Sequence, residues 1–201
     1  LPKKFQDAGP RIVEMPQEGK APAQVWKYED RVYPYIGLNA VAGKDLTEFG
    51  TEPTRYADMI PGCYDPKARV TDMDIDGVWG GVNFPTFPRY AGTVFLEAKD
   101  KELALLGLKA WNDFCLDEWC ATAPDRFIPI MLLPLWDIAA SIEEIRRCHA
   151  KGAKCIGFPE NPVPLGLPSF HTDHWDRLFD VVEELDMPLT MHFGTSGKAP
   201  S

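Results

Sequence analysis

The chain has 201 residues, of which 45% are hydrophobic and 25% are charged, the composition of a folded globular protein rather than of a disordered one. Its 30 acidic and 21 basic residues give a formal net charge of -9, and the basic pairs at 3–4 and 146–147 do not extend into a patch, so no nucleic-acid partner is expected. No apolar run reaches the roughly 18 to 20 residues of a membrane helix and the N-terminus shows no signal-peptide segment, so we expect a cytoplasmic protein with no membrane partner.

Residues 1–70 are rich in proline and glycine and show little sustained periodicity. The exception is "QVWKYEDRVYPYIG" (24–37), which alternates like a strand and predicts a hairpin that turns at Glu29 and Asp30. We therefore interpret this region as loop and ribbon, an insertion rather than a domain with its own core.

From Ala68 onward, strand-like and helix-like segments alternate, which predicts parallel β-strands with helical crossovers. The expected strands are 77–87, 127–136, 155–160 and 188–193, and the last three begin at the spacing of roughly 30 residues that is typical of βαβ units. Two architectures fit, an open doubly wound sheet or part of a (β/α)₈ barrel. No glycine-rich phosphate loop follows any strand, which favours the barrel.

Three helices are expected between these strands. The first spans 97–121, with two apolar stripes: Leu103, Leu106, Ala110 and Phe114; and Leu108, Trp111, Cys115 and Trp119. The second begins after Asp137 as N-cap and ends at Gly152, with its isoleucines inward and its charged side chains outward, namely Glu143, Glu144, Arg146 and Arg147. Asp173 is expected to cap the third helix.

Ligand sites of parallel α/β folds lie at the carboxyl ends of the strands, where this chain places polar and aromatic residues. His192, at the end of the last strand, is the foremost candidate for a metal ligand or an acid–base group, although a backbone carbonyl could equally satisfy its imidazole. Phe84, Arg89, Trp136 and Glu160 are the candidate substrate contacts. For Arg89 the alternative is a surface arginine, and for Glu160 it is a pairing with a nearby lysine.

The remaining histidines and cysteines point to structural roles. His171 and His174 lie at a helix start, and His149 lies near a helix end, where a cation suits the helix dipole. Five cysteines without a C-x-x-C spacing indicate neither a disulfide framework nor a zinc knuckle. Cys155 begins a buried strand and is expected in the core.

Four segments, taken together, resemble a known family: "MDIDGVWGGVNFPTFPR", "KAWNDFCLDEWCATAPDRFIPIMLLPLWD", "EEIRRCHAKGAKCIGFPENP" and "LPSFHTDHWDRLFDVVEELDMPLTMHFGTSG". They are similar to consecutive pieces of the amidohydrolase-related family, in the branch that resembles aminocarboxymuconate-semialdehyde decarboxylase, from about Tyr64 to Gly197. The stretch "GLNAVAGKDLTEFGTEPTRYADMIPGCYDPKAR" also resembles the insertion that many members carry between their first and second barrel strands.

The resemblance implies a (β/α)₈ TIM barrel of the metal-dependent hydrolase type, with residues 71–201 supplying about strands two to five and residues 1–70 forming the insertion. Family members bind one divalent metal ion, usually zinc. Its ligands are an H-x-H pair or acidic equivalent after the first strand, a histidine after the fifth and an aspartate after the eighth, while a histidine after the sixth assists acid–base chemistry. His192 matches the fifth-strand ligand. Because the other positions have no counterpart in these 201 residues, we expect the catalytic residues outside this segment, in a longer enzyme or in another chain or copy.

The implied activity is metal-dependent hydrolysis or decarboxylation of a small carboxylate or aromatic compound, in an enzyme that is often a homodimer. Two alternatives remain. One is a non-catalytic barrel remnant that acts as a binding or assembly subunit. The other is an open-sheet hydrolase with Cys155 or Ser196 as nucleophile, which the absence of a G-x-S-x-G elbow disfavours.

Overall fold

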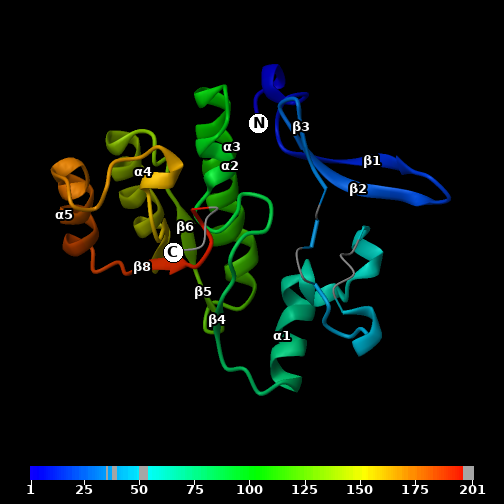
Figure 1. The fold of residues 1–201 in the computed structure, drawn as a ribbon. Helices are drawn as coiled ribbons and strands as arrows, with labels where there is room; N and C mark the ends of the chain where they lie inside the picture. Colours follow the sequence, from blue (N-terminus) through cyan, green and yellow to red (C-terminus); the bar gives the residue numbers. More distant parts are fainter. Residues whose placement is uncertain (35, 38–39, 50–53, 197–201) are drawn as a thin grey trace. The chain divides into compact units, whose positions relative to one another are not determined.

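The computed structural model describes residues 1–34, 36–37, 40–49 and 54–196 (Figure 1). The chain separates into two compact units, Leu1–Trp79 and Gly80–Ser201. Parts of the expected insertion (35, 38–39 and 50–53) and Gly197 of the last family segment lie outside the described residues. Within the described part of the chain, no helix is long and apolar enough to cross a membrane.

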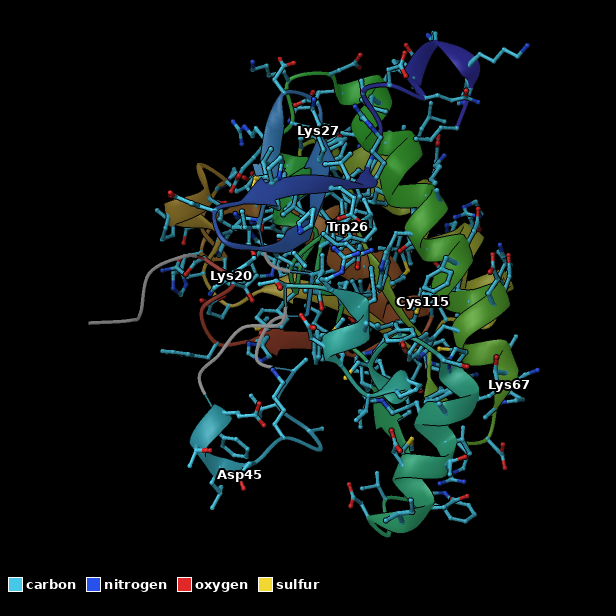
Figure 2. The ribbon with its side chains drawn as sticks, turned by 90° about the vertical axis from the view of Figure 1, so that its right-hand side faces the viewer. Lys20, Trp26, Lys27, Asp45, Lys67 and Cys115 are labelled. Carbon is cyan, nitrogen blue, oxygen red and sulfur yellow. The ribbon has the colours of Figure 1, made fainter. Side chains whose placement is uncertain are left out.

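The first unit is built on a three-stranded antiparallel sheet, in the order β1 (Arg11–Gln17), β2 (Lys20–Tyr28) and β3 (Arg31–Tyr33). The predicted hairpin at Glu29 and Asp30 is confirmed, with Glu29 in the left-handed region at a φ of 50°. Figure 2 labels Trp26 and Lys27, neighbours on β2. Strand β1 was not predicted, although Gly19, at a φ of 67° in the turn before β2, is a typical hairpin signal.

Helix α1 (Pro66–Ile75) follows three short 3₁₀ turns, Leu46–Glu48, Tyr56–Asp58 and Pro61–Cys63. The side chain of Asp65 accepts a hydrogen bond from the backbone N–H of Lys67 at 2.8 Å, and Pro66 occupies the first helical position. Lys67 lies in the first turn (Figure 2). An N-cap aspartate followed by proline is a helix-start signal that the sequence interpretation overlooked.

The second unit contains the strands of the predicted alternating pattern, and their predicted parallel pairing is confirmed. Strand β4 (Gly81–Val82) pairs with β5 (Phe127–Ile128), and a second sheet has the order β6 (Ile130–Leu132), β7 (Cys155–Pro159) and β8 (Leu189–His192). The expected single strand at 127–136 is interrupted at Pro129, which has no N–H to donate. In the described residues these strands do not close into a barrel.

The described part of this unit contains the α-helices α2 (Thr93–Leu96), α3 (Lys101–Asp113), α4 (Ile138–Ala150) and α5 (Asp176–Glu184). Helix α3 begins later than predicted because Asp100 caps it, and it continues through a π-helical turn, Phe114–Trp119. The predicted cap of α4 is confirmed, since the Asp137 side chain accepts from the Ala140 N–H at 3.0 Å. The expected cap at Asp173 is wrong: Asp173 begins a 3₁₀ turn, and Trp175 precedes α5.

The sheet β6–β7–β8 has two different faces. Side chains of Met131, Ile156 and Phe158 share a buried cluster with Ile145 of α4 and Leu178 of α5, and both helices lie beside this sheet in Figure 1. Because successive residues of a strand point to opposite faces, Leu132, Gly157, Thr190 and His192 belong to the other face. This alternation places His192 on the face away from α4 and α5.

The segment after β4 covers that other face. A Cβ atom on Gly157 would lie 2.8 Å from the carbonyl oxygen of Tyr90, and one on Gly92 would lie 3.5 Å from Leu132 Cδ1. The contact at Gly157 is too close for any side chain, so the backbone of Tyr90 can approach the sheet there only because residue 157 is glycine. The chain after β4 is thereby brought next to His192.

A buried polar network connects α3, β6 and α4. Asn112 donates to the Leu132 carbonyl at 3.0 Å and to Glu144 at 2.7 Å, and its own side-chain oxygen accepts from the Leu132 N–H at 2.8 Å. Arg147 donates to both oxygens of Glu144, at 2.7 and 2.8 Å. Glu144, predicted to face outward, is therefore completely buried because its charge is paired in the interior.

Candidate functional site

His192 is the last residue of β8, next to Pro159 in the parallel pairing with β7. Its ring is half-buried, and Nδ1 lies 2.7 Å from the carbonyl oxygen of Phe193. Since a carbonyl oxygen only accepts hydrogen bonds, Nδ1 carries the hydrogen and donates it. In the neutral imidazole, Nε2 is then the nitrogen with the free lone pair, which is the arrangement found in metal-ligating histidines.

Two aromatic side chains from the segment after β4 surround this imidazole. The Tyr90 ring stacks on it, with ring centres 3.7 Å apart and planes inclined by 17°. The Phe84 ring meets His192 edge-on at 5.5 Å and Tyr90 edge-on at 5.7 Å. The structure thus brings the predicted residue Phe84 to His192 and adds Tyr90, which the sequence analysis did not single out.

Glu160, the residue after β7, holds the loop that follows His192. Its carboxylate accepts hydrogen bonds from the backbone N–H groups of Gly194 and Ser196, both at 3.2 Å, and from the Ser196 hydroxyl at 2.8 Å. Partial burial raises the pKa of Glu160, but the hydrogen bonds from Ser196 and Gly194 outweigh it and keep the pKa below its ordinary value. The carboxylate is therefore ionised near neutral pH and bonded to the chain's own loop.

Arg89 and Trp136 contact other parts of the same unit. The Arg89 guanidinium donates to Glu97 at 2.9 Å in an exposed ion pair, and Lys101 lies over the Trp136 ring at 4.9 Å from its centre. Their described contacts thus run to Glu97, just after α2, and to α3, and not to the imidazole. As substrate contacts, both residues stay predictions.

The surroundings of the remaining histidines, of Cys155 and of Ser196 indicate structural roles. His149, His171 and His174 are exposed, with His149 in the last turn of α4. Cys155 is buried, which raises the pKa of its thiol. The Ser196 hydroxyl donates a hydrogen bond to the Glu160 carboxylate. These surroundings do not favour a cysteine or serine nucleophile.

The described residues supply only part of the ligand set for the metal ion that the sequence resemblance implies. His192 suits a metal ligand because Nδ1 is held by a carbonyl and leaves Nε2 free. Among the described residues, however, no group of three histidine, cysteine, aspartate or glutamate side chains could hold a metal ion. A catalytic zinc ordinarily has three protein ligands, so these residues by themselves do not fit a complete site.

Comparisons with known proteins give a consistent family signal. The family model described as Amidohydrolase matches residues 23–200. A gamma-resorcylate decarboxylase from Rhodococcus jostii (strain RHA1) is 29% identical over 153 residues, which cover 68% of this chain and 45% of the relative. A second gamma-resorcylate decarboxylase, from Rhizobium sp. (strain MTP-10005), is 33% identical over 102 residues, covering 46% of this chain and 29% of the relative.

A solved structure agrees with the fold of this chain. The crystal structure of an amidohydrolase from Mycobacterium avium subsp. paratuberculosis K-10 matches with a TM-score of 0.66 and 25% identity. The match covers 98% of this chain and 55% of that chain. The chain spans less than half the length of the curated relatives that it matches.

Proposed function

Because this chain belongs to the amidohydrolase family, we propose that it is part of a metal-dependent decarboxylase that acts on a small aromatic carboxylate. The curated relatives that match it are decarboxylases, which favours loss of carbon dioxide over hydrolysis. The structural observation that carries the proposal is the His192 imidazole, held through Nδ1 at the carboxyl end of a parallel strand and enclosed by two aromatic rings.

We further propose that β4, β5 with β6, β7 and β8 are the second to fifth strands of a (β/α)₈ barrel. Their parallel pairing in sequence order supports this assignment. So do the position of α4 and α5 on one face of the sheet and the match to the mycobacterial amidohydrolase. In this proposal residues 1–70 are the insertion between the first two strands.

In the same proposal His192 is one ligand of a divalent metal ion, with zinc as our choice, and the other ligands come from outside the described part of the chain. Phe84 and Tyr90 form an apolar wall beside His192 that suits a flat aromatic ring. The planar guanidinium of Arg89 has the geometry to hold a carboxylate through two hydrogen bonds, and Trp136 would extend the aromatic surface. Glu160, a residue we also expected near the substrate, supports the site through its loop.

The test uses the full-length enzyme and gamma-resorcylate as the first substrate, with carbon dioxide release as the measurement. We expect activity that a chelator abolishes and that added divalent metal restores. His192→Ala should lose the bound metal and at least about 100-fold in kcat/KM. His171→Ala, at an exposed histidine in the same unit, is the matched control and should behave as the wild type.

Two results would overturn the proposal. One is an enzyme with full metal content and activity after His192→Ala. The other is an enzyme that hydrolyses ester or amide analogues but releases no carbon dioxide from any hydroxybenzoate, which would assign hydrolysis instead. The alternative of a non-catalytic remnant gains no support from the matched relatives, which are named as enzymes. Cytoplasmic location and a homodimeric state stay predictions.

A further inference from the structure

We propose that Tyr90 is a positioning residue that fixes the plane of the His192 imidazole, and that Gly157 provides the space that seats Tyr90 there. The proposal rests on the proposed function only for the role that it gives to His192. It concerns three residues of one compact unit, contributed by the segment after β4, by β7 and by β8.

One hydrogen bond does not define the orientation of a ring. The bond from Nδ1 to the Phe193 carbonyl holds one corner of the imidazole but still allows the ring to tilt about the Nδ1···O line. The Tyr90 ring lies against the imidazole face at 3.7 Å and nearly parallel to it, and this contact opposes the tilt. Phe84 supports both rings edge-on.

The sheet leaves room for the backbone of Tyr90 at Gly157. A side chain on Gly157 would bring Cβ to 2.8 Å from the Tyr90 carbonyl oxygen and 3.2 Å from Leu132 Cδ2. The nearer atom belongs to the backbone, so it could not swing aside as a flexible side chain does. Gly157 and Thr190 are neighbours across β7 and β8, two residues before the pair of Pro159 and His192 on the same face. The backbone of Tyr90 is therefore seated on the sheet directly beside the imidazole.

The residue before Tyr90 also restrains this segment. Arg89 has a φ of 59°, a left-handed conformation that costs free energy for any residue other than glycine. It is held between two turns, in which its N–H donates to Thr86 and its carbonyl accepts from Gly92. Such a conformation persists only where the surroundings enforce it. The backbone conformation at Arg89 thus fixes the position of Tyr90 beside His192.

Together these restraints set the direction of the Nε2 lone pair. A ligand or acid–base group works only when it is held within roughly 10 to 20° of its productive orientation, and neighbouring residues provide that precision. Tyr90 has no need to touch the substrate for this role. The orientation of His192 requires the ring of Tyr90 but not its hydroxyl. Substitutions at Tyr90 distinguish the two.

The experiment compares three variants of the full-length protein with the wild type: Tyr90→Leu, Tyr90→Phe and Gly157→Ala. Tyr64→Leu, the same change at a half-exposed tyrosine of the other unit, is the matched control. The first readout is the NMR spectrum of the His192 ring protons, which a ring stacked face to face shifts upfield. The second is the dissociation constant for zinc, measured by competition with a chelator, and the third is the thermal midpoint of unfolding.

We expect Tyr90→Leu to remove the upfield shift and to weaken zinc binding about tenfold. Tyr90→Phe should restore both the shift and the affinity, because the ring is retained. Gly157→Ala should move the His192 resonances in the same direction as Tyr90→Leu, while Tyr64→Leu should leave them unchanged. Unaltered His192 resonances in a folded Tyr90→Leu protein would overturn the proposal, as would failure of Tyr90→Phe to restore them.

Failure of the proposed function is distinguishable from failure of this inference. If His192→Ala retains zinc while Tyr90→Leu still moves the His192 resonances, the metal role is wrong and the positioning role stands. If His192→Ala loses zinc and Tyr90→Leu behaves as the wild type, the metal role stands and the positioning role is wrong. Should Gly157→Ala fail to fold, the two Tyr90 variants decide the result.

Discussion

Glu160 illustrates how a single carboxylate can organise a loop. Both of its oxygens accept hydrogen bonds from Ser196, and one also accepts from the N–H of Gly194. An amide in this place would present an NH₂ group to backbone donors and leave one of them without an acceptor. The loop after His192 therefore depends on both the negative charge and the two acceptor oxygens of Glu160.

We therefore expect Glu160→Gln to loosen the segment after His192. The free energy of unfolding should fall by about 1 kcal/mol, a modest value because the carboxylate is only half-buried. Urea denaturation measures the change, and hydrogen exchange at Gly194 and Ser196 should accelerate. Glu183→Gln, at an exposed position of α5, is the control. Equal exchange rates in the two variants would contradict the assigned role.

Glu144 gives a prediction that depends on pH. Burial raises its pKa, but hydrogen bonds from Arg147 and Asn112 outweigh burial and hold the pKa below the ordinary value of 4.5. A lowered folded-state pKa means that the ionised carboxylate stabilises the fold above about pH 4.5. This contribution is lost as the pH falls through the lowered pKa.

Glu144→Gln should destabilise the protein by about 2 to 3 kcal/mol at pH 7, because it leaves Arg147 without its buried carboxylate. The variant should also lose less stability than the wild type between pH 7 and pH 3, so the two denaturation curves converge in acid. Exposed Glu143→Gln, on the same helix, should follow the wild type at every pH. A constant difference across this pH range would refute the assignment.

At the scale of single residues, the sequence predicts those site residues whose place follows from the end of a strand. His192 and Phe84 were identified because parallel strands end at one edge of a sheet. The sequence does not indicate Tyr90, because tight turns around Arg89, and not the period of a strand or helix, bring Tyr90 to the imidazole. Glu144 was placed outside because a glutamate ordinarily faces water, and no periodic pattern reveals that its charge is paired in the interior.

Among the elements, the helix caps show where local signals decide a boundary. Asp137 accepts from the Ala140 N–H and begins α4, whereas Asp173, in a sequence that looks equally suitable, lies inside a 3₁₀ turn. Asp137→Ala should therefore reduce the free energy of unfolding by about 1 kcal/mol, and Asp137→Asn should recover most of the loss. Asp173→Ala should cost clearly less. Thermal unfolding measures all three, and equal costs for the two alanine variants would contradict the assignment.

The strands show the limits of periodicity. The apolar run 127–136 predicted one strand, but the missing N–H of Pro129 divides it between two sheets. The helix expected at 97–121 was interpreted as having two inward stripes, yet Ala110 and Phe114 are exposed. The buried side is formed by residues such as Leu103, Leu108 and Cys115. Tertiary contacts decide which residues of the two stripes pack inward, and hydrophobic spacing alone does not predict those contacts.

For the whole molecule, the ligands that the chain supplies predict how much zinc it retains. The purified 201-residue chain, equilibrated with zinc and then dialysed, should retain far less than one ion per chain, since the described residues supply one suitable histidine and no group of three ligands. Elemental analysis after dialysis measures the content. One zinc per chain that disappears in His192→Ala would show that this chain completes a site by itself.

The bonds between Asn112 and Leu132 have a consequence for the order in which the second unit folds. A side-chain amide binds the two backbone groups of Leu132 that a neighbouring strand would otherwise bind. We therefore expect these two backbone groups of Leu132 to stay unpaired during folding until α3 docks against β6. In pulse-labelling during refolding, the Leu132 amide should become protected together with α3 and after the contacts between β6 and β7.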